Sequence, residues 1–252
     1  MTFPLTLHVG PLQITAHAIL EVAAYFIGFR YFLHLRKQQG DAIAANNRQW
    51  IILGAAFGAW LGAHLVGALE DPVGWAQSGH PFLHFFLSKT ILGGLLGGLA
   101  GVELTKLIIG EKHSSGDLFT YPLILAMIIG RMGCLSMGVY EPTYGNPTHL
   151  PWAMDLGDSI YRHPTALYEI IFLGLLWLTL AGIENRFVLR SGARFQLFMM
   201  GYLLYRFAVD FIRPGFRWWE GGLTTLQLTA LLGLIYYLRL TRLRFVDVKK
   251  TA

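Results

Sequence analysis

The sequence is short of charge and has almost no cysteine. Asp, Glu, Lys and Arg together make up 14% of its 252 residues, whereas 54% are hydrophobic. This balance leaves too little polar surface to cover an ordinary water-soluble domain. The single cysteine, Cys134, excludes an internal disulfide and any metal site built from several thiolates. The composition therefore predicts a membrane protein.

Long apolar stretches alternate with short polar connectors along the sequence. Each stretch has about 17 or more residues, enough to cross roughly 30 Å of hydrocarbon as a helix. We therefore expect an all-α membrane protein with a single transmembrane domain over residues 1–252 and a long connector at about 140–164. The bundle of about seven predicted transmembrane helices covers residues 13–34, 48–69, 82–109, 118–139, 165–184, 194–213 and 224–240.

Lys and Arg residues gather in alternate connectors. Fourteen of the 20 follow the first, third and fifth predicted helices or lie at the C-terminus. Basic connectors resist translocation and stay on the cytoplasmic side, so we expect the N-terminus outside and the C-terminus inside. The net charge of +5 is then a topology signal and does not indicate nucleic-acid binding. The C-terminal group consists of Arg239, Arg242, Arg244, Lys249 and Lys250.

Six basic residues are not explained by topology. A charge inside a spanning helix is costly unless it faces a polar interior and finds a partner, so such residues are candidates for function. Four of them could converge on the outer half of the bundle, where they would suit a phospholipid headgroup. These four are Lys89, Arg131, Arg162 and Arg206, and the other two are Arg213 and Arg217.

The sixth predicted helix carries polar residues at helical spacing. Tyr202, Arg206 and Asp210 are four residues apart and share one face, and Arg213 follows one turn later. This pattern has two interpretations. The Arg–Asp pair could lock two helices together, or the arginine could bind phosphate.

Three other segments bring possible reactive groups to the outer half. Gly130 and Gly133 flank Arg131 and would let a ligand or backbone come close. His17 and Glu21 share a helix face and could form a general base with its orienting carboxylate, half of a metal site, or a structural pair. Lys89 could be a snorkelling lysine or part of the site.

The long connector and the helix after it are rich in polar and aromatic residues. A connector of this kind could form a lid or a surface that binds an acceptor. Glu169 could pair with a buried arginine, act in catalysis, or do both. The candidates here are Arg162 and His163 before Pro164, and Tyr168 and Glu169 after it.

Three motifs occur in order: GRMGC at 130–134, RHPTALYE at 162–169 and GYLLYRFAVDFIRP at 201–214, followed by Gln227. With these motifs the chain resembles the prolipoprotein diacylglyceryl transferases. The resemblance implies a multi-pass enzyme of the bacterial inner membrane whose site faces the periplasm. Such an enzyme moves the diacylglyceryl group of phosphatidylglycerol from membrane lipid onto the lipobox cysteine of a preprolipoprotein and releases glycerol phosphate. No metal or soluble cofactor is implied.

The resemblance also assigns residues. Arg131 matches the arginine of the GRxGN signature, and Arg206 matches a second essential arginine with Tyr202 and Asp210 beside it. These two arginines would hold the phosphate. The resemblance also implies the following site-forming positions: Gly130, Gly133, Cys134, Arg162, His163, Tyr168, Glu169 and Gln227.

The chain departs from the family at the proton-transfer residues. Leu92 stands where the family has the histidine of an HGG segment, and Cys134 stands where the signature has asparagine. Glu141 aligns with the family's glutamate only across a small insertion, and HAILE replaces a tyrosine-bearing segment in the first helix. Lys89, or His17 with Glu21, could supply the missing base. The alternatives are a transferase with another acceptor and a non-catalytic protein that binds or transports phospholipid.

Overall fold

The computed structural model describes residues 3–240 and 246–249. Its helices are α1 (Ala16–Gln39), α2 (Ala45–Ala68), α3 (Pro72–Gln77), α4 (Pro81–Leu87), α5 (Ile91–Ile109), α6 (Asp117–Met137), α7 (Thr165–Arg186), α8 (Ala193–Val209) and α9 (Thr225–Leu240). Two 3-10 turns follow α6 and α8, η1 (Gly138–Tyr140) and η2 (Asp210–Ile212). Arg242, Arg244 and Lys250 lie outside the described residues.

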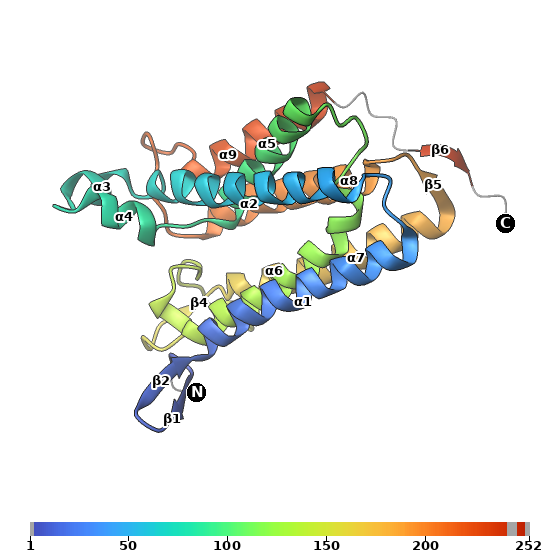
Figure 1. The fold of residues 1–252 in the computed structure, drawn as a ribbon. Helices are drawn as coiled ribbons and strands as arrows, with labels where there is room; N and C mark the ends of the chain where they lie inside the picture. Colours follow the sequence, from blue (N-terminus) through green and yellow to red (C-terminus); the bar gives the residue numbers. More distant parts are fainter. Residues whose placement is uncertain (1–2, 241–245, 250–252) are drawn as a thin grey trace.

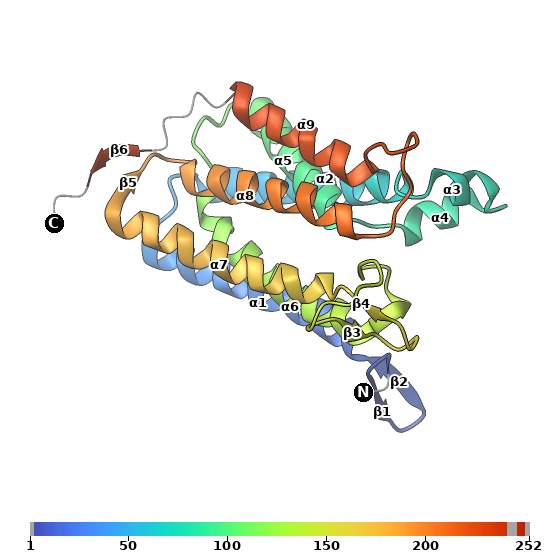
Figure 2. The same ribbon diagram turned by 180° about the vertical axis from the view of Figure 1, so that it is seen from behind.

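Short strands form three antiparallel pairs at the ends of the bundle. They pair β1 (Thr6–Val9) with β2 (Leu12–Thr15), β3 (Met154–Asp155) with β4 (Tyr161–Arg162), and β5 (Phe187–Leu189) with β6 (Val246–Lys249). The first two pairs lie at the same end as α3 and α4, whereas β5 and β6 lie at the opposite end (Figures 1 and 2). We call the end with α3, α4, β1–β2 and β3–β4 the outer end.

The predicted all-α membrane architecture is confirmed. Among the residues that the structure describes, six helices are long and apolar enough to cross a membrane: α1, α2, α5, α6 with η1, α7, and α8 with η2. The seventh predicted segment corresponds to α9, whose 16 residues span roughly 24 Å as a helix.

One predicted helix is wrong in its extent. The expected helix over 82–109 is divided, because α4 ends at Leu87 and α5 begins at Ile91. Ser88 is extended, with φ −85° and ψ 123°. Thr90 then caps α5, and its hydroxyl accepts a hydrogen bond from the Gly93 amide at 3.1 Å. The break leaves Lys89 in a connector and free of helical constraint.

The spanning helices pack as two groups. In one group α1 and α7 flank α6, and in the other α2, α5, α8 and α9 pack together. Figure 1 shows the groups one above the other, and α8 joins them through its contacts with α6 and α7. Fully buried side chains fill this junction, with Ile124 from α6, Leu173 from α7, and Phe198 and Leu203 from α8 all 0% exposed.

Glycines let α2 and α5 pack backbone against backbone. Gly58 and Gly62 of α2 face Gly93 and Gly97 of α5. A Cβ atom at position 97 would lie 2.3 Å from the Gly58 carbonyl oxygen. Side chains of any size would therefore force these helices apart.

Replacing Gly97 by alanine should destabilise the protein, because the added methyl group meets rigid backbone. We expect a lower melting temperature in detergent, corresponding to about 1–3 kcal/mol of overpacking. Gly94→Ala is the matched control, since a Cβ there would be 3.7 Å from its nearest neighbours, an ordinary contact. Equal melting temperatures for the two variants would contradict the close packing.

Candidate active site

Two arginines from different helices meet at one carboxylate near the outer end. Arg131 of α6 places Nε 2.9 Å from Oε1 of Glu169 in α7. Arg206 of α8 places Nη1 3.4 Å from Oε2 of the same carboxylate. The three residues are between 2% and 6% exposed. Glu169 therefore holds both guanidinium groups in one buried site.

Tyr202 is the next member of this group. It lies one turn before Arg206 on α8, is 0% exposed, and donates its hydroxyl to Oε1 of Glu169 at 2.8 Å. The spacing of four residues places both side chains on one face of α8, as the sequence predicted, and in the structure both contact Glu169 of α7. Glu169 is thus contacted by one side chain from α6 and two from α8.

Tyr202→Phe should lower the melting temperature of the lipid-free protein, since a hydrogen bond to a charged group contributes about 1.5–3 kcal/mol. Tyr205→Phe provides the matched control, because the buried Tyr205 hydroxyl has no hydrogen-bond partner among the described residues. Its melting temperature should change little. A larger decrease for Tyr205→Phe than for Tyr202→Phe would contradict the role of the Tyr202 hydroxyl.

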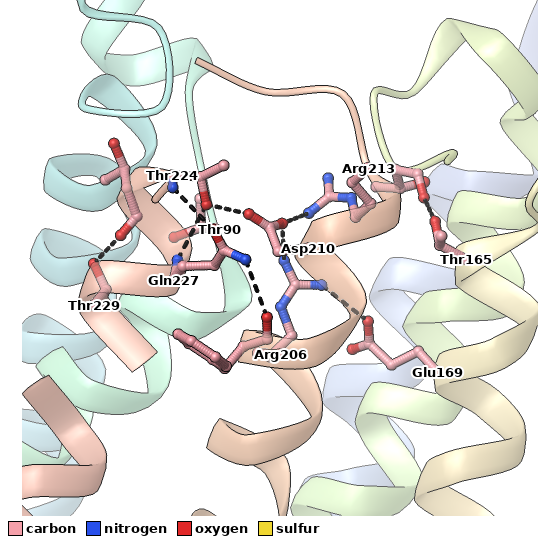
Figure 3. A network of polar contacts seen from close by, with 12 residues as sticks. Thr90, Thr165, Glu169, Arg206, Asp210, Arg213, Thr224, Gln227 and Thr229 are labelled. Carbon is pink, nitrogen blue, oxygen red and sulfur yellow. Dashed lines mark hydrogen bonds and ion pairs between the residues drawn. The ribbon is translucent and has the colours of Figure 1, made fainter. Parts of the chain in front are cut away.

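Asp210 extends the cluster toward the outer end. Its carboxylate lies 3.8 Å from Arg206 Nη2 and 3.2 Å from Arg213 Nη1, and it accepts a hydrogen bond from the Thr224 hydroxyl. Figure 3 shows Arg206 between Glu169 and Asp210. Both interpretations of the α8 spacing are therefore compatible with the geometry, since Arg206 has acidic neighbours and also faces a second arginine.

Gln227 acts on this cluster through Thr224. The side-chain oxygen of Gln227 accepts a hydrogen bond from the backbone amide of Thr224 at 3.0 Å. The backbone amide of Gln227 donates to the Thr224 hydroxyl oxygen at 3.2 Å (Figure 3). Thr224 in turn donates to Asp210. Gln227 therefore positions the N-terminal end of α9 beside the cluster.

The arginines of the cluster have more hydrogen-bond donors than the neighbouring carboxylates use. Three guanidinium groups, those of Arg131, Arg206 and Arg213, face the carboxylates of Glu169 and Asp210. Within the described part of the chain, the buried Nε atoms of Arg206 and Arg213 have no hydrogen-bond partner. An anion with several acceptor oxygens fits this surplus.

Glu70 is a neighbour that the sequence did not single out. It follows α2, is half-buried, and interacts electrostatically with Arg213 and Arg206. Burial raises the pKa of its carboxyl group above the usual value, although the arginines act in the opposite direction. Glu70 lies in a connector with no motif around it, so no sequence signal indicated it.

The signature segment around Arg131 also contacts α1. Arg131 Nη1 donates to the Sγ atom of Cys134 at 3.6 Å. A Cβ atom at Gly133 would lie 3.4 Å from the His17 Cα atom, an ordinary contact, so α1 packs directly beside this residue. A Cβ atom at Gly130 would meet nothing within 4 Å.

The three residues considered as a base form one cluster. Lys89 donates from Nζ to Oε1 of Glu21 at 2.8 Å, and His17 Nε2 lies 3.5 Å from Oε2. The cluster links α1 to the break between α4 and α5. Among the described residues no group of three His, Cys, Asp or Glu side chains could hold a metal ion. Leu92 is 1% exposed and packs in the apolar core.

The connector residues form contacts of their own. Arg162 donates from Nε to Asp158 at 3.0 Å, and its guanidinium group lies 5.0 Å from the centre of the Tyr144 ring. The hydrogen bond from Arg162 lowers the pKa of Asp158. His163 Nδ1 is 3.2 Å from the Tyr168 hydroxyl. The structure thus brings Arg131 and Arg206 together, whereas Arg162 pairs within the connector and Lys89 pairs with α1.

Comparison with known proteins agrees with the motifs on which this site is built. The family model described as prolipoprotein diacylglyceryl transferase matches residues 4–241. The phosphatidylglycerol–prolipoprotein diacylglyceryl transferase of Bordetella avium (strain 197N) is 32% identical, over 83% of this chain and 81% of that protein. The enzymes of the same name from Wolbachia pipientis subsp. Culex pipiens (strain wPip) and Cupriavidus metallidurans are each 29% identical, over 96% and 83% of this chain and 96% and 80% of their own lengths. Because the family model spans the α6, α7 and α8 segments that build the arginine cluster, the chain belongs to the prolipoprotein diacylglyceryl transferase family.

Proposed function

We propose that this protein transfers the diacylglyceryl group of phosphatidylglycerol to the cysteine thiol of a lipoprotein precursor. The observation that carries the proposal is the meeting of Arg131 and Arg206 at Glu169. Two guanidinium groups from separate helices, in a buried site, can bind the phosphate of one lipid from both sides.

The same arrangement favours the reaction. The acceptor sulfur attacks the carbon of the diacylglyceryl group that is bonded to the phosphate. The bond from that carbon to the phosphate oxygen breaks. Negative charge then increases on the departing glycerol phosphate. Fixed guanidinium groups stabilise this charge most strongly in a site that excludes water, so electrostatic stabilisation is the main contribution of Arg131 and Arg206 to the rate.

The proposed location is the inner membrane of a bacterium, with the site open to the periplasm. Basic residues at the inner ends of three helices support this orientation: Lys37 on α1, Lys106 on α5 and Arg186 on α7. The arginine cluster lies toward the outer end, where α6 and α8 finish and α7 begins. Phosphatidylglycerol would enter from the surrounding membrane lipid.

The connector between α6 and α7 is the proposed surface for the lipobox peptide. It lies at the outer end, next to the arginine cluster, and Arg213 Nη2 donates to the Pro142 carbonyl oxygen at 2.9 Å. Exposed aromatic side chains, those of Tyr140, Trp152 and Tyr161, are available for contact with a peptide.

Mass spectrometry tests the proposal. The purified protein in vesicles of phosphatidylglycerol is incubated with a synthetic lipobox peptide that carries one cysteine. We expect the peptide to gain one diacylglyceryl group and free glycerol phosphate to appear. The same peptide with serine in place of cysteine is the control and should remain unmodified. An unmodified cysteine peptide in the presence of folded protein would overturn the proposal.

A further inference from the structure

A thiol acceptor must lose its proton before or during the attack. A cysteine thiol has a pKa of about 8.5, so at neutral pH few acceptors are already ionised. Leu92, in the position of the family's histidine, is buried and cannot take a proton. A base must therefore come from another part of this chain.

His17 is held at the start of α1 with one ring nitrogen engaged. Thr15 caps the helix by accepting a hydrogen bond from the Ala18 amide at 3.2 Å. The imidazole Nε2 atom lies 3.5 Å from the Glu21 carboxylate. The other ring nitrogen, Nδ1, is buried and has no hydrogen-bond partner among the residues that the structure describes. This second nitrogen is available as a proton acceptor.

The imidazole lies next to the arginine that would hold the lipid phosphate. The His17 backbone packs against Gly133, the residue before Cys134, and the Cys134 side chain interacts electrostatically with the imidazole. The Cys134 sulfur is 3.6 Å from Arg131 Nη1. Cys134 therefore lies close to both the imidazole and the guanidinium group.

Two charged residues hold the imidazole in place. Glu21 contacts His17 through one carboxylate oxygen and Lys89 through the other, at 3.5 and 2.8 Å. A carboxylate beside an imidazole orients the ring and stabilises the imidazolium ion that forms when a proton arrives. Glu141, after η1, also interacts electrostatically with His17 and Lys89, so the groups facing this imidazole are Glu21, Glu141 and Cys134.

We propose that His17 takes the proton of the acceptor thiol, with Glu21 and Lys89 as positioning residues, in place of the histidine that this chain lacks. This inference rests on the proposed transferase function. The S–H proton moves to His17 Nδ1, and the sulfur forms its bond to the glycerol carbon. The carbon–oxygen bond to the phosphate breaks, and its electron pair leaves with glycerol phosphate. That phosphate then accepts the proton from the imidazolium ion, which restores the neutral base.

The pH dependence of His17→Gln tests the inference. Transfer to a lipobox peptide is measured in phosphatidylglycerol vesicles at about pH 6.5 and pH 9. A general base contributes about 10²- to 10⁴-fold, so we expect a loss of at least about 100-fold at the lower pH. At the higher pH the acceptor thiol is mostly ionised, and the loss should shrink by about tenfold or more. Arg131→Ala should lose activity equally at both pH values.

Two further variants complete the experiment. His8→Gln, in the exposed β1 strand, is the matched control and should behave like the wild type. His17→Ala should regain activity when free imidazole is added, which a purely structural histidine would not allow. Glu21→Gln should lower kcat by about tenfold while the KM for the peptide changes little, because it acts through His17.

The outcomes separate the two proposals. If the wild type does not modify the peptide at any pH, the transferase function itself is wrong. If the wild type is active and His17→Gln matches it at pH 6.5, or loses activity by the same factor at both pH values, only the assignment of His17 is overturned. Melting temperatures of all variants identify any that fail to fold.

Discussion

Replacing Arg131 or Arg206 by alanine is expected to lower the rate of diacylglyceryl transfer by about 10³-fold, the upper end of the effect of removing one preorganised charge-stabilising donor. In each variant only one of these two guanidinium groups remains to bind the phosphate. Glu169 is still present and competes with the phosphate for that guanidinium group. The initial rate of peptide lipidation is the measurement. Lysine at either position should recover part of the activity, because it restores the positive charge but not the bidentate hydrogen bonding of arginine.

A surface arginine provides the control for these variants. Arg190 is exposed and directly follows β5, which lies at the end opposite the outer end (Figure 1), so Arg190→Ala should transfer lipid at the wild-type rate. A melting curve for each protein shows whether it is folded. Full activity of folded Arg131→Ala or Arg206→Ala would refute the phosphate-binding role of that residue.

The second large effect is expected for Glu169→Gln. The substitution keeps the shape of the side chain but leaves two buried guanidinium groups without their shared charge. Breaking a buried ion pair in this way costs about 3–5 kcal/mol, so the melting temperature of the lipid-free protein should fall clearly. Phosphatidylglycerol should raise it again by more than in the wild type, because the lipid phosphate supplies the missing negative charge.

Asp158→Asn is the corresponding control. It removes a carboxylate that pairs with Arg162 in the connector, away from the core, where solvent screens the interaction. Its melting temperature should stay near that of the wild type. If Glu169→Gln melts at the wild-type temperature, or if phosphatidylglycerol stabilises it no more than it stabilises the wild type, Glu169 does not serve as the counterion that the lipid replaces.

The spanning helices could be predicted because they depend on a property that the sequence displays directly. Apolar length identified α1, α2, α6, α7 and α8 to within five residues at each end. The break between α4 and α5 could not be found in this way. It depends on three residues, Ser88 to Thr90, and on the carbonyl of Ser88 contacting His64 Nδ1 at 2.7 Å, a tertiary contact from α2.

The candidate site could be predicted in part for a similar reason. Helical spacing placed Tyr202, Arg206 and Asp210 on one face, and this required only local geometry. That Arg131 and Arg206 share Glu169 depends on how three helices pack, which no spacing within one helix reveals. Arg162 is the opposite case, because its contact is local. Its partner Asp158 lies four residues away within the same connector.

The structure brings together the residues that the sequence offered as alternative bases. Lys89 and the His17–Glu21 pair were separate alternatives in the sequence, because Glu21 and Lys89 are 68 positions apart. In the structure one carboxylate contacts both. The geometry around Glu21 supports the proposed roles, with His17 as the base and Lys89 as a positioning residue.

The affinity for phosphatidylglycerol tests most directly whether Arg131 and Arg206 bind the same phosphate group. It is measured by native mass spectrometry for the wild type, Arg131→Ala, Arg206→Ala and the double variant. If both arginines hold one phosphate, each single variant should bind at least about tenfold more weakly, since hydrogen bonds to charged groups contribute about 1.5–3 kcal/mol. The double variant should then lose much less than the product of the two single effects. Wild-type affinity in both single variants, or fully independent losses in the double variant, would contradict a common phosphate site.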